Sequence, residues 1–388
     1  MIRYYIWLQT ALGAANPRAI KALEYFGSVE AVFKAGNEVR AKSGIFTKKE
    51  LSHLESVTLS DSLKIMAKCN SSGIEIIPYG SEKYPFCLSV IPDAPLLLYV
   101  KGKMPRFDAV PTVCIVGPRK VSEFGKKAAY SLGYRLAASG MIVVSGGAVG
   151  TDTYAHAGAL KAGGTTVLCL GCGILSDYLP ENAKLRKAVS ESGCLISEYP
   201  PEYKASKYTF PVRNRIMSAL SLGTVVIEAG IKSGALITAR HAYEQGRDVF
   251  VIPGSPEDSK YEGSNLLLRD GARPILDVSD IFNEYIPRFP DKINIDKAFE
   301  KPIIAGENKI KNEKEVENIT KEIKTEKNLP QTLSKEAKMV YNYLDKQFFL
   351  PEEIAAPDIG GQQLLSALTE LEMEFLIKAL PGGRYEKL

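Results

Sequence analysis

Short apolar runs alternate along residues 111–254 with segments in which apolar residues recur at helical spacing. The short runs predict buried strands, and the amphipathic segments between them predict helices. The expected strands are residues 113–116, 142–144, 166–170, 194–197, 224–227 and 249–252, and the main expected helices are residues 122–139, 182–191, 213–220 and 235–245, with another from about residue 152. This alternation predicts an α/β fold: an extended, Rossmann-like, doubly wound parallel sheet with helices on both faces.

Unusual residues follow four of the expected strands. They form the turns Gly117-Pro118-Arg119, Ser145-Gly146-Gly147, Gly171-Cys172-Gly173 and Glu228-Ala229-Gly230. In doubly wound sheets, ligands bind at the carboxyl ends of the strands, where these turns lie. Glycine lets a ligand approach the main chain, and the free amides of a helix N-terminus attract anions. The sequence therefore predicts an anion site, most simply for phosphate, at this edge of the sheet.

The N-terminal segment has a different pattern. Residues 1–70 carry short amphipathic repeats broken by Asn16-Pro17 and Gly27, which predicts a small helical domain of the SAM-like or helix-hairpin-helix-like type. Such a domain can hold a nucleic-acid backbone, but it is more often a packing module. Two strand-like pieces follow it, so we place the boundary of the Rossmann-like core at residues 71–290.

The C-terminal third of the chain contains two further segments. Residues 291–332 are assigned to a flexible charged linker, because 18 of the 40 residues in 291–330 are charged and Phe299 is the single aromatic there. Residues 333–388 regain helical patterning and end in a Pro-Gly-Gly-Arg turn, which predicts a winged-helix-like domain. Its six basic and nine acidic residues argue against DNA binding by this domain alone and favour contact with a protein.

Composition says more about where the protein is located than about what it does. A net charge of +4 is too small to indicate a partner, so any anion site must be a local cluster. Six cysteines in a chain of this length do not form a disulfide framework. No apolar run approaches membrane-spanning length, and the apolar N-terminus continues into an amphipathic pattern that is typical of a globular helix. We expect a cytoplasmic protein without membrane contact.

One stretch combines positive charge with aromatic rings. Residues 203–215, YKASKYTFPVRNR, hold no acidic residue. Basic groups follow a phosphate backbone and aromatic rings stack on unpaired bases, so the stretch is typical of a single-strand contact. The candidate DNA-binding residues here are Lys207, Phe210, Arg213, Asn214 and Arg215. The alternative is a solvated loop anchored by Phe210, with Asn214 capping the helix that follows.

The turns supply the remaining candidates for phosphate binding. They are Gly117, Arg119, Ser145, Gly146 and Gly147 after the first two core strands, and Lys232, Ser233 and Gly234 before the helix at 235–245. A guanidinium after a glycine can grip phosphate through two hydrogen bonds, and a Ser-Gly pair at a helix start can form a phosphate nest. Each has a structural alternative: a solvated arginine, a tight strand-to-helix turn and a helix cap.

Several features resemble catalytic or metal sites only in part. Cys169 and Cys172 form a single C-x-x-C without a second pair, which favours buried thiols over zinc. Asp152 and His156 lie one helical turn apart, and with no further ligand in sight a hydrogen-bonded structural pair is the better interpretation. Glu228 is the most enzyme-like carboxylate, unless it only accepts backbone amides. We expect no metal and no cofactor.

Three strings together identify a family resemblance. SGGAVGTDTYAH at 145–156, FPVRNRIMSALS at 210–221 and SGALITARHAYEQGRDVFVIPG at 233–254 resemble the DNA-processing protein A family, also called Smf. The resemblance spans roughly residues 74–282. It implies a Rossmann-like core that binds single-stranded DNA without catalytic activity. It also implies a homodimer that protects incoming DNA and loads the RecA recombinase during natural transformation and homologous recombination.

One position departs from the family pattern. The family's usual Gly-Ser-Arg is Gly117-Pro118-Arg119 here, so the arginine is kept while a hydroxyl and an amide are lost. A second hypothesis rests on the glycine turns and the strand-end Glu228, which also resemble lysine-decarboxylase-like nucleotide hydrolases: the chain would hydrolyse nucleoside monophosphates. In that case Arg119 and the turns would hold the nucleotide and Glu228 would assist cleavage. The missing P-G-G-x-G-T string argues against it.

Overall fold

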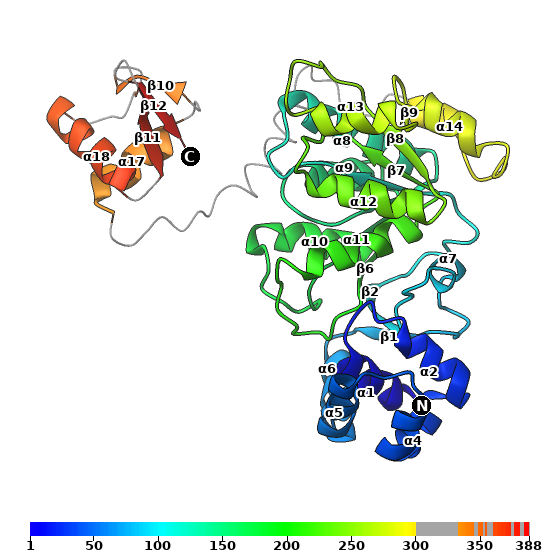
Figure 1. Cartoon of the computed structure of the whole chain (residues 1–388). Coiled ribbons are helices and arrows are strands. Elements are labelled where there is room, and N and C mark those ends of the chain that lie inside the picture. The colour runs from blue at the N-terminus through cyan, green and yellow to red at the C-terminus, as the bar shows by residue number, and fades with distance from the viewer. Residues whose placement is uncertain are drawn as a thin grey trace. The chain divides into compact units, whose positions relative to one another are not determined.

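The chain forms two compact units, Met1–Glu307 and Asn308–Leu388 (Figure 1). The computed structural model describes residues 1–299, 333–344, 348–351, 354, 360–373, 376–380 and 384–387. From residue 300 onward, the linker expected at 291–332 lies outside the described residues.

A single large sheet organises the first unit. Its strands are β1 Glu75–Pro78, β2 Leu97–Gly102, β3 Thr112–Val116, β4 Ile142–Ser145, β5 Thr166–Leu170, β6 Cys194–Ser197, β7 Gly223–Val226, β8 Asp248–Val251 and β9 Arg273–Pro274. Their order is β1-β2-β6-β5-β4-β3-β7-β8-β9. The pairs from β6 to β9 are parallel, whereas β1 and β2 add an antiparallel edge. The predicted Rossmann-like, doubly wound sheet is confirmed, and every expected core strand is present.

Helices cover both faces of this sheet (Figure 1). Those of the core are α7 Phe86–Ser89, α8 Glu123–Ala138, α9 Thr151–Lys161, α10 Ala183–Ser192, α11 Thr209–Ala219, α12 Gly234–Glu244, α13 Glu262–Arg269, α14 Ser279–Tyr285 and α15 Ile295–Phe299. Helices α11 and α12 pack on the face that carries Cys114 and Val116 of β3. Helices α8, α9 and α14 pack on the opposite face, which carries Val113 and Ile115. The strand's period of two therefore divides the core into two layers.

The strand order places a crevice at one point of the sheet. After β3 the chain returns to β4 on one side, and later to β7 on the other. Strands β4 and β7 thus flank β3, and the loops that leave their carboxyl ends diverge. In open α/β sheets this reversal of strand order is where ligands bind.

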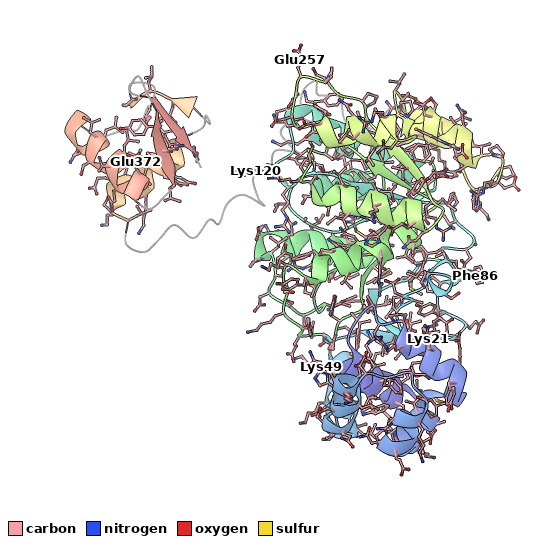
Figure 2. The ribbon with its side chains drawn as sticks, viewed as in Figure 1. Lys21, Lys49, Phe86, Lys120, Glu257 and Glu372 are labelled. Carbon is pink, nitrogen blue, oxygen red and sulfur yellow. The ribbon has the colours of Figure 1, made fainter. Side chains whose placement is uncertain are left out.

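The N-terminal helices join this unit instead of forming a separate one. They are α1 Ile2–Leu12, α2 Arg18–Phe26, α3 Val29–Lys34, α4 Gly36–Lys42, α5 Lys48–Ser56 and α6 Leu59–Ser71. They have a core of their own around Trp7 and Leu8, while Ile6 packs with strand residues of β2. The helical character of residues 1–70 is confirmed. Lys21 and Lys49 lie exposed on the outside of these helices (Figure 2).

The other boundary of the core also differs from the expectation. Residues 291–299, which their charge assigns to the linker, pack against the core: the Asn294 amide donates to the Ser139 carbonyl oxygen at 2.9 Å. Ala298 is buried against α8, and the Arg135 guanidinium lies 4.8 Å from the Phe299 ring centroid. The sequence does not reveal this short helix, because residues 291–299 are rich in charge and only a few apolar side chains make the contacts with the core.

The second unit is small and mixed. Its described elements are α17 Lys335–Tyr343, β10 Phe348–Phe349, α18 Gly361–Met373, β11 Ile377–Leu380 and β12 Arg384–Lys387. Strands β11 and β12 pair antiparallel, and β10 adds to β12. The expected helices and closing hairpin are present, and Val340, Leu368 and Leu371 meet in their core. Assignment as a winged helix stays a prediction.

Candidate functional site

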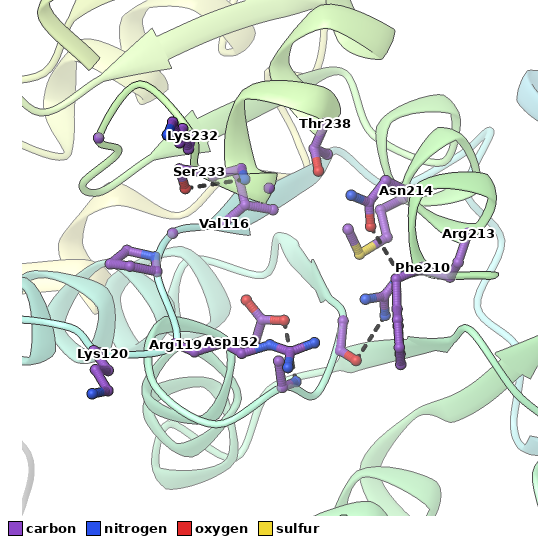
Figure 3. Close-up of a pocket in the computed structure, with 18 of the residues that line it drawn as sticks. Val116, Arg119, Lys120, Asp152, Phe210, Arg213, Asn214, Lys232, Ser233 and Thr238 are labelled. Atoms are coloured by element: carbon purple, nitrogen blue, oxygen red, sulfur yellow. Dashed lines mark hydrogen bonds between the residues drawn. The ribbon is translucent and has the colours of Figure 1, made fainter. Parts of the chain in front are cut away.

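A cleft of about 650 Å³ opens at the carboxyl ends of β3, β4 and β7 (Figure 3). Loops 117–120, 146–152 and 230–235 form much of its wall, and helix α11 and residues 259–260 complete it. Its lining residues are Val116, Gly117, Pro118, Arg119, Lys120, Gly146, Ala148, Asp152, Tyr178, Phe210, Arg213, Asn214, Met217, Gly230, Lys232, Ser233, Gly234, Ala235, Thr238, Ser259 and Lys260. The crevice predicted from strand order is therefore an open, lined space.

Exposed cations stand around the cleft. Arg119 and Lys120 follow β3, Lys232 precedes α12, and Lys260 lies on the segment before α13. All four side chains belong to exposed residues, and Figure 2 shows Lys120 at the surface. The carboxylate in the lining, Asp152, is buried. Positive charge above a partly enclosed space attracts an anionic ligand.

The start of helix α12 is an unobstructed anion-binding feature of the cleft. Ser233 caps the helix, and its hydroxyl oxygen accepts the Ala235 amide at 3.3 Å. Gly234 has nothing within 4 Å of the position that a Cβ would take, so an anion can approach the main chain there. Lys232 stands beside these amides and adds to the partial positive charge of the helix end.

The start of helix α8 is already occupied by the protein's own carboxylate. Glu228 is fully buried and accepts a hydrogen bond from the Ser122 amide at 3.1 Å. It also bonds the Ser122 hydroxyl, and the Tyr261 hydroxyl donates to it at 3.1 Å. These contacts favour the structural alternative considered for Glu228, with two hydroxyl groups bonded in addition to a backbone amide. The residue does not line the cleft.

The turn after β4 is filled from within. The Arg213 guanidinium donates to the carbonyl oxygen of Gly146 at 2.7 Å and to that of Cys169. A Cβ at Gly146 would overlap this guanidinium. Gly147, at φ +68°, turns toward Leu168 instead of the cleft. The predicted phosphate cradle at 145–147 is therefore a structural turn closed by an arginine.

Asp152 and His156 of α9 lie beneath this turn. The Ala148 amide donates to Asp152 at 3.2 Å, while burial raises the pKa of this carboxyl against the opposing charge of Arg213. His156 is fully buried, with Nδ1 2.8 Å from the Thr166 hydroxyl. Burial and the nearby Arg213 lower the pKa of His156 to about 3, so the imidazole is neutral. Each side chain bonds a different neighbour, so the hydrogen-bonded pair predicted from their spacing is wrong.

Two rings and one guanidinium form a cluster on the cleft wall. The Phe210 and Tyr178 ring centroids are 5.0 Å apart with planes at 44°. The Arg119 guanidinium lies 5.6 Å from the Phe210 ring centroid and donates to the Tyr178 hydroxyl at 3.3 Å. Half-buried rings beside an exposed cation can stack a planar group and hold its charge.

The candidate residues divide into two groups. Those that line the cleft are Gly117, Arg119, Gly146, Phe210, Arg213, Asn214, Lys232, Ser233 and Gly234. Those outside its lining are Ser145, Gly147, Lys207 and Arg215. Ser145 is buried, and its hydroxyl donates to the Ile115 carbonyl oxygen at 2.7 Å. Lys207 is exposed on the preceding loop, 5.2 Å from the ring centroid of Tyr208.

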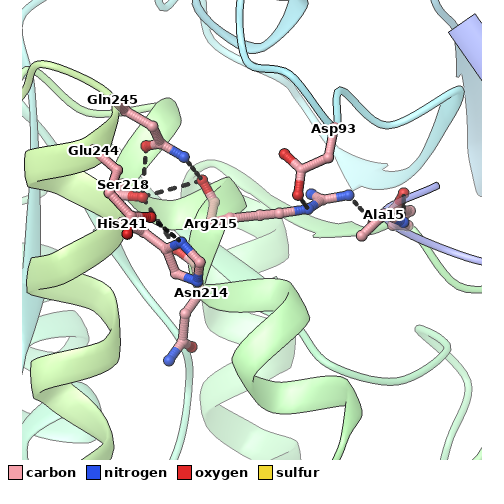
Figure 4. A network of polar contacts seen from close by, with 9 residues as sticks. Ala15, Asp93, Asn214, Arg215, Ser218, His241, Glu244 and Gln245 are labelled. Carbon is pink, nitrogen blue, oxygen red and sulfur yellow. Dashed lines mark hydrogen bonds and ion pairs between the residues drawn. The ribbon is translucent and has the colours of Figure 1, made fainter. Parts of the chain in front are cut away.

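Arg215 needs a correction. The side chain is 2% exposed, and its Nη2 donates to Glu198 at 2.8 Å. Its Nε lies 3.0 Å from an oxygen of Asp93, a contact of charges more than an aligned hydrogen bond (Figure 4). Glu198 in turn accepts the Ala15 amide at 2.9 Å. Arg215 thus links the core to the N-terminal helices and is not available to a phosphate.

The alternative assigned to Asn214 is also wrong. Helix α11 begins at Thr209, so Asn214 lies inside the helix and caps nothing. Its side-chain oxygen accepts the Arg213 Nε at 3.1 Å. The helix starts early because Pro211 falls in the first turn, where its missing amide costs no helical hydrogen bond.

The departure at Pro118 has a visible local consequence. The Pro118 carbonyl oxygen accepts the Thr151 amide at 3.3 Å and the Thr151 hydroxyl at 3.2 Å, so this residue supports the start of α9. Gly150, at φ +87°, lets the two loops meet, since a Cβ there would overlap the Arg119 carbonyl. Proline keeps these carbonyl contacts while removing the hydroxyl that the family pattern carries.

Sequence reasoning missed part of the lining. Tyr178, Ser259 and Lys260 are absent from the candidates, and the sequence pattern gives Lys120 no role beyond a solvated surface charge. Tyr178 carries a usable signal, because it follows the Gly171-Cys172-Gly173 turn at a strand end. Lys260 carries none, because only the folded loop after β8 brings it to the cleft.

The described residues contain no metal-site geometry. No three histidine, cysteine, aspartate or glutamate side chains gather among them as a metal ion would require. Burial raises the pKa of Cys169 to about 12, and it also raises that of Cys172, which disfavours the thiolates that zinc needs. No helix in the part of the chain that the structure describes combines the length and apolarity needed to cross a membrane.

The chain is similar to known proteins of one family. A family model described as DNA recombination-mediator protein A matches residues 75–286. The DNA processing protein DprA of Bacillus subtilis is 40% identical over 221 residues, which cover 57% of this chain and 74% of that protein. The Streptococcus pneumoniae DNA processing protein A structure superposes with a TM-score of 0.64 at 32% identity, covering 73% of this chain and 98% of that one.

A second solved structure of this kind also aligns with the chain. DNA processing protein A from Helicobacter pylori, described for its unique single-stranded DNA binding mode, aligns with a TM-score of 0.50 at 29% identity. The alignment covers 55% of this chain and 96% of that one. The family model spans the strands of the Rossmann-like core, whose carboxyl ends carry the cleft.

The buried ion pair gives a stability prediction. Arg215→Met leaves Glu198 buried without its partner, and we expect a loss of about 3–5 kcal/mol in the free energy of unfolding. Trp7, the single tryptophan, is buried in the N-terminal helices and reports urea unfolding by fluorescence. Arg215→Met/Glu198→Gln should recover most of the loss, since it removes the orphaned charge and keeps an acceptor for Ala15. A double variant no more stable than the single one contradicts this account.

His156 gives a pH prediction. The unfolded chain protonates this imidazole below about pH 6.5, whereas the folded chain resists protonation until about pH 3. The free energy of unfolding therefore falls as pH decreases through this window, by up to about 1.4 kcal/mol per pH unit. Trp7-monitored urea titrations from pH 7 to 4 should show a shallower slope for His156→Gln. Equal slopes for both proteins would show that His156 is accessible to protons.

Proposed function

The chain belongs to the DNA recombination-mediator protein A family, and we propose that it binds single-stranded DNA in the cleft at the carboxyl ends of β3, β4 and β7. The observation that carries this proposal is the pairing of exposed cations with an aromatic wall in one open space. Arg119, Lys120, Lys232 and Lys260 supply charge, and Phe210 with Tyr178 supplies the wall.

The two kinds of group fit the two parts of an unpaired strand. Phosphates carry the charge that the lysines and Arg119 neutralise, and bases can stack on a ring only when they are not paired. One stacked base contributes about 1–3 kcal/mol. Phosphate contact and stacking read little of the base sequence, so binding should tolerate most sequences. The H. pylori relative, described as binding single-stranded DNA, supports the same assignment.

We propose that the protein acts by binding and not by turnover. The alternative function, hydrolysis of nucleoside monophosphates, needs a carboxylate in the cleft. Glu228 instead accepts Ser122 and Tyr261 and lies outside the lining. Asp152 lines the cleft, but its carboxylate is held by the Ala148 amide beneath Arg213.

The wider role is proposed from the family alone. It comprises protection of incoming DNA, loading of the RecA recombinase during natural transformation and homologous recombination, and action as a homodimer. A dimer would extend the DNA track beyond one cleft. We place this activity in the cytoplasm, and the six free cysteines, five of them buried, suit a reducing compartment.

Removal of the cleft cations should weaken binding without unfolding. We expect Arg119→Ala and Lys232→Ala each to lower the affinity for an oligothymidine in a fluorescence-polarisation titration. Each should also reduce the slope of log affinity against log salt by about 0.7, the counterion release of one single-strand phosphate. Lys49→Ala removes an equal charge from an exposed site on α5 and is the matched control.

The competing ligand in these titrations is duplex DNA of equal length. Wild-type protein should prefer the single strand at both of two salt concentrations, because stacking survives salt while phosphate attraction weakens. Equal affinity of Arg119→Ala, Lys232→Ala and Lys49→Ala for the single strand would place the DNA site elsewhere.

The enzyme alternative is tested directly. We expect no free base when the protein is incubated with nucleoside 5′-monophosphates and the mixture is separated by liquid chromatography. Base release that disappears in Glu228→Gln would instead favour the hydrolase. Circular dichroism of Glu228→Gln is the control, because the Ser122 amide loses a charged acceptor in this variant.

A further inference from the structure

The loop that joins β5 to α10, residues 171–182, carries Tyr178 into the cleft. Both ends of this loop are fastened to the core. The Gly173 amide donates to the Tyr203 carbonyl oxygen at 2.8 Å, and the Asn182 side-chain amide donates to the Gly147 carbonyl oxygen at 2.9 Å. Tyr178 is therefore held on a fixed segment and not on a free loop.

The backbone next to Tyr178 is strained. Leu179 has a φ of +51°, in the left-handed region that a branched side chain rarely adopts. Such a residue persists only where its surroundings over-determine it. Here Arg186 of α10 donates from Nη1 to the carbonyl oxygens of both Tyr178, at 2.8 Å, and Leu179, at 2.9 Å. Strain of this kind concentrates at ligand clamps.

The segment held by Arg186 presents the Tyr178 side chain to the cleft, an aromatic ring with a hydroxyl at its tip. The ring continues the aromatic surface of Phe210, 5.0 Å between centroids, and the hydroxyl accepts from Arg119 at 3.3 Å. Partial burial raises the pKa of Tyr178, so the phenol stays protonated at neutral pH and keeps a proton to donate. Apolar surface and a polar tip together match an unpaired base attached to its phosphate.

We propose that Tyr178 is a base-contacting residue of this cleft: its ring extends Phe210 into one stacking surface for an unpaired nucleobase, and Arg186 positions it. This inference rests on the proposed function and adds to it a specific role for Tyr178, direct contact with a base, where the proposed function counts the residue only as part of the cleft wall. Arg186 acts only through the backbone of Tyr178 and Leu179, so it is a positioning residue.

The same geometry couples base and phosphate binding. In the free protein the Arg119 guanidinium stands against Phe210 and bonds Tyr178. A base that stacks on this surface displaces the guanidinium, which then turns to the strand's phosphate. A phosphate without a base gains less binding free energy from Arg119. The guanidinium must leave its contacts with Phe210 and Tyr178, and nothing replaces it on the rings.

The test compares strands with and without bases. Tyr178→Leu should weaken binding of a short oligothymidine about 5- to 150-fold, the equivalent of one lost stack. The same substitution should change binding of an abasic strand of equal length less than twofold. Tyr178→Phe keeps the ring and should stay within about threefold of wild type on the oligothymidine. Polarisation titrations measure all three, and thermal melts check folding.

Arg186→Met tests the positioning role. It should reproduce the base-dependent loss of Tyr178→Leu at smaller size, with little effect on the abasic strand. Lys187→Met, which removes the neighbouring exposed charge on α10, is the matched control and should leave both affinities unchanged.

The outcomes separate this inference from the function beneath it. Wild-type protein that binds neither strand removes both. Wild-type protein that binds while Tyr178→Leu binds equally well removes only the role of Tyr178. Equal losses for Tyr178→Leu on the oligothymidine and the abasic strand show a merely structural residue and overturn the proposal.

Discussion

Helix α11 carries two buried arginines, and the arrangement of the site depends on what they bind. Arg213 closes the strand ends of β4 and β5 by bonding the carbonyl oxygens of Gly146 and Cys169. Arg215, on another side of the helix, reaches Glu198 and Asp93 and so ties the helix to the N-terminal module. With both guanidinium groups engaged, α11 is fixed at its middle, and Phe210 in its first turn stands at a defined place in the cleft. A buried charge needs such partners.

The protein's own side chains already occupy some of the turns at the carboxyl edge of the sheet. This determines which turns remain open to a ligand. Glu228 occupies the start of α8 and Arg213 occupies the turn after β4, so two of the turns that looked suited to an anion are complete without one. The start of α12 holds only its own serine cap beside an exposed lysine, Lys232. The cleft therefore has an exposed helix start on one side and aromatic rings on the other.

The sequence predicts the sheet well because strand and helix patterns are local. It also predicts the correct edge, since parallel strands bring their carboxyl ends together whatever their contacts. It could not say what Arg213 and Arg215 contact, because residues two positions apart on a helix point in directions roughly 160° apart and only tertiary packing says what each direction meets. Nor could it show that Arg213 fills the turn at Gly146, 67 residues away. Lys260 escaped for the same reason, because a distant loop brings it to the cleft, whereas Tyr178 follows a turn at a strand end that the sequence already marks.

The cleft has two parts: a floor of buried side chains that are already hydrogen-bonded, and a rim of exposed cations, Arg119, Lys120, Lys232 and Lys260. This division determines what kind of ligand suits the cleft. The floor groups are Arg213, which bonds backbone carbonyl oxygens, and Asp152, which accepts a backbone amide, so both are engaged before any ligand arrives. The rim cations are exposed, well hydrated and screened by salt, and each alone contributes modestly. For the proposed single-stranded DNA ligand, affinity would then come from several phosphates acting together with a stacking surface that salt does not screen. A polymer with a charge and a planar base in every unit meets that requirement better than a single nucleotide, which could engage only a fraction of the rim.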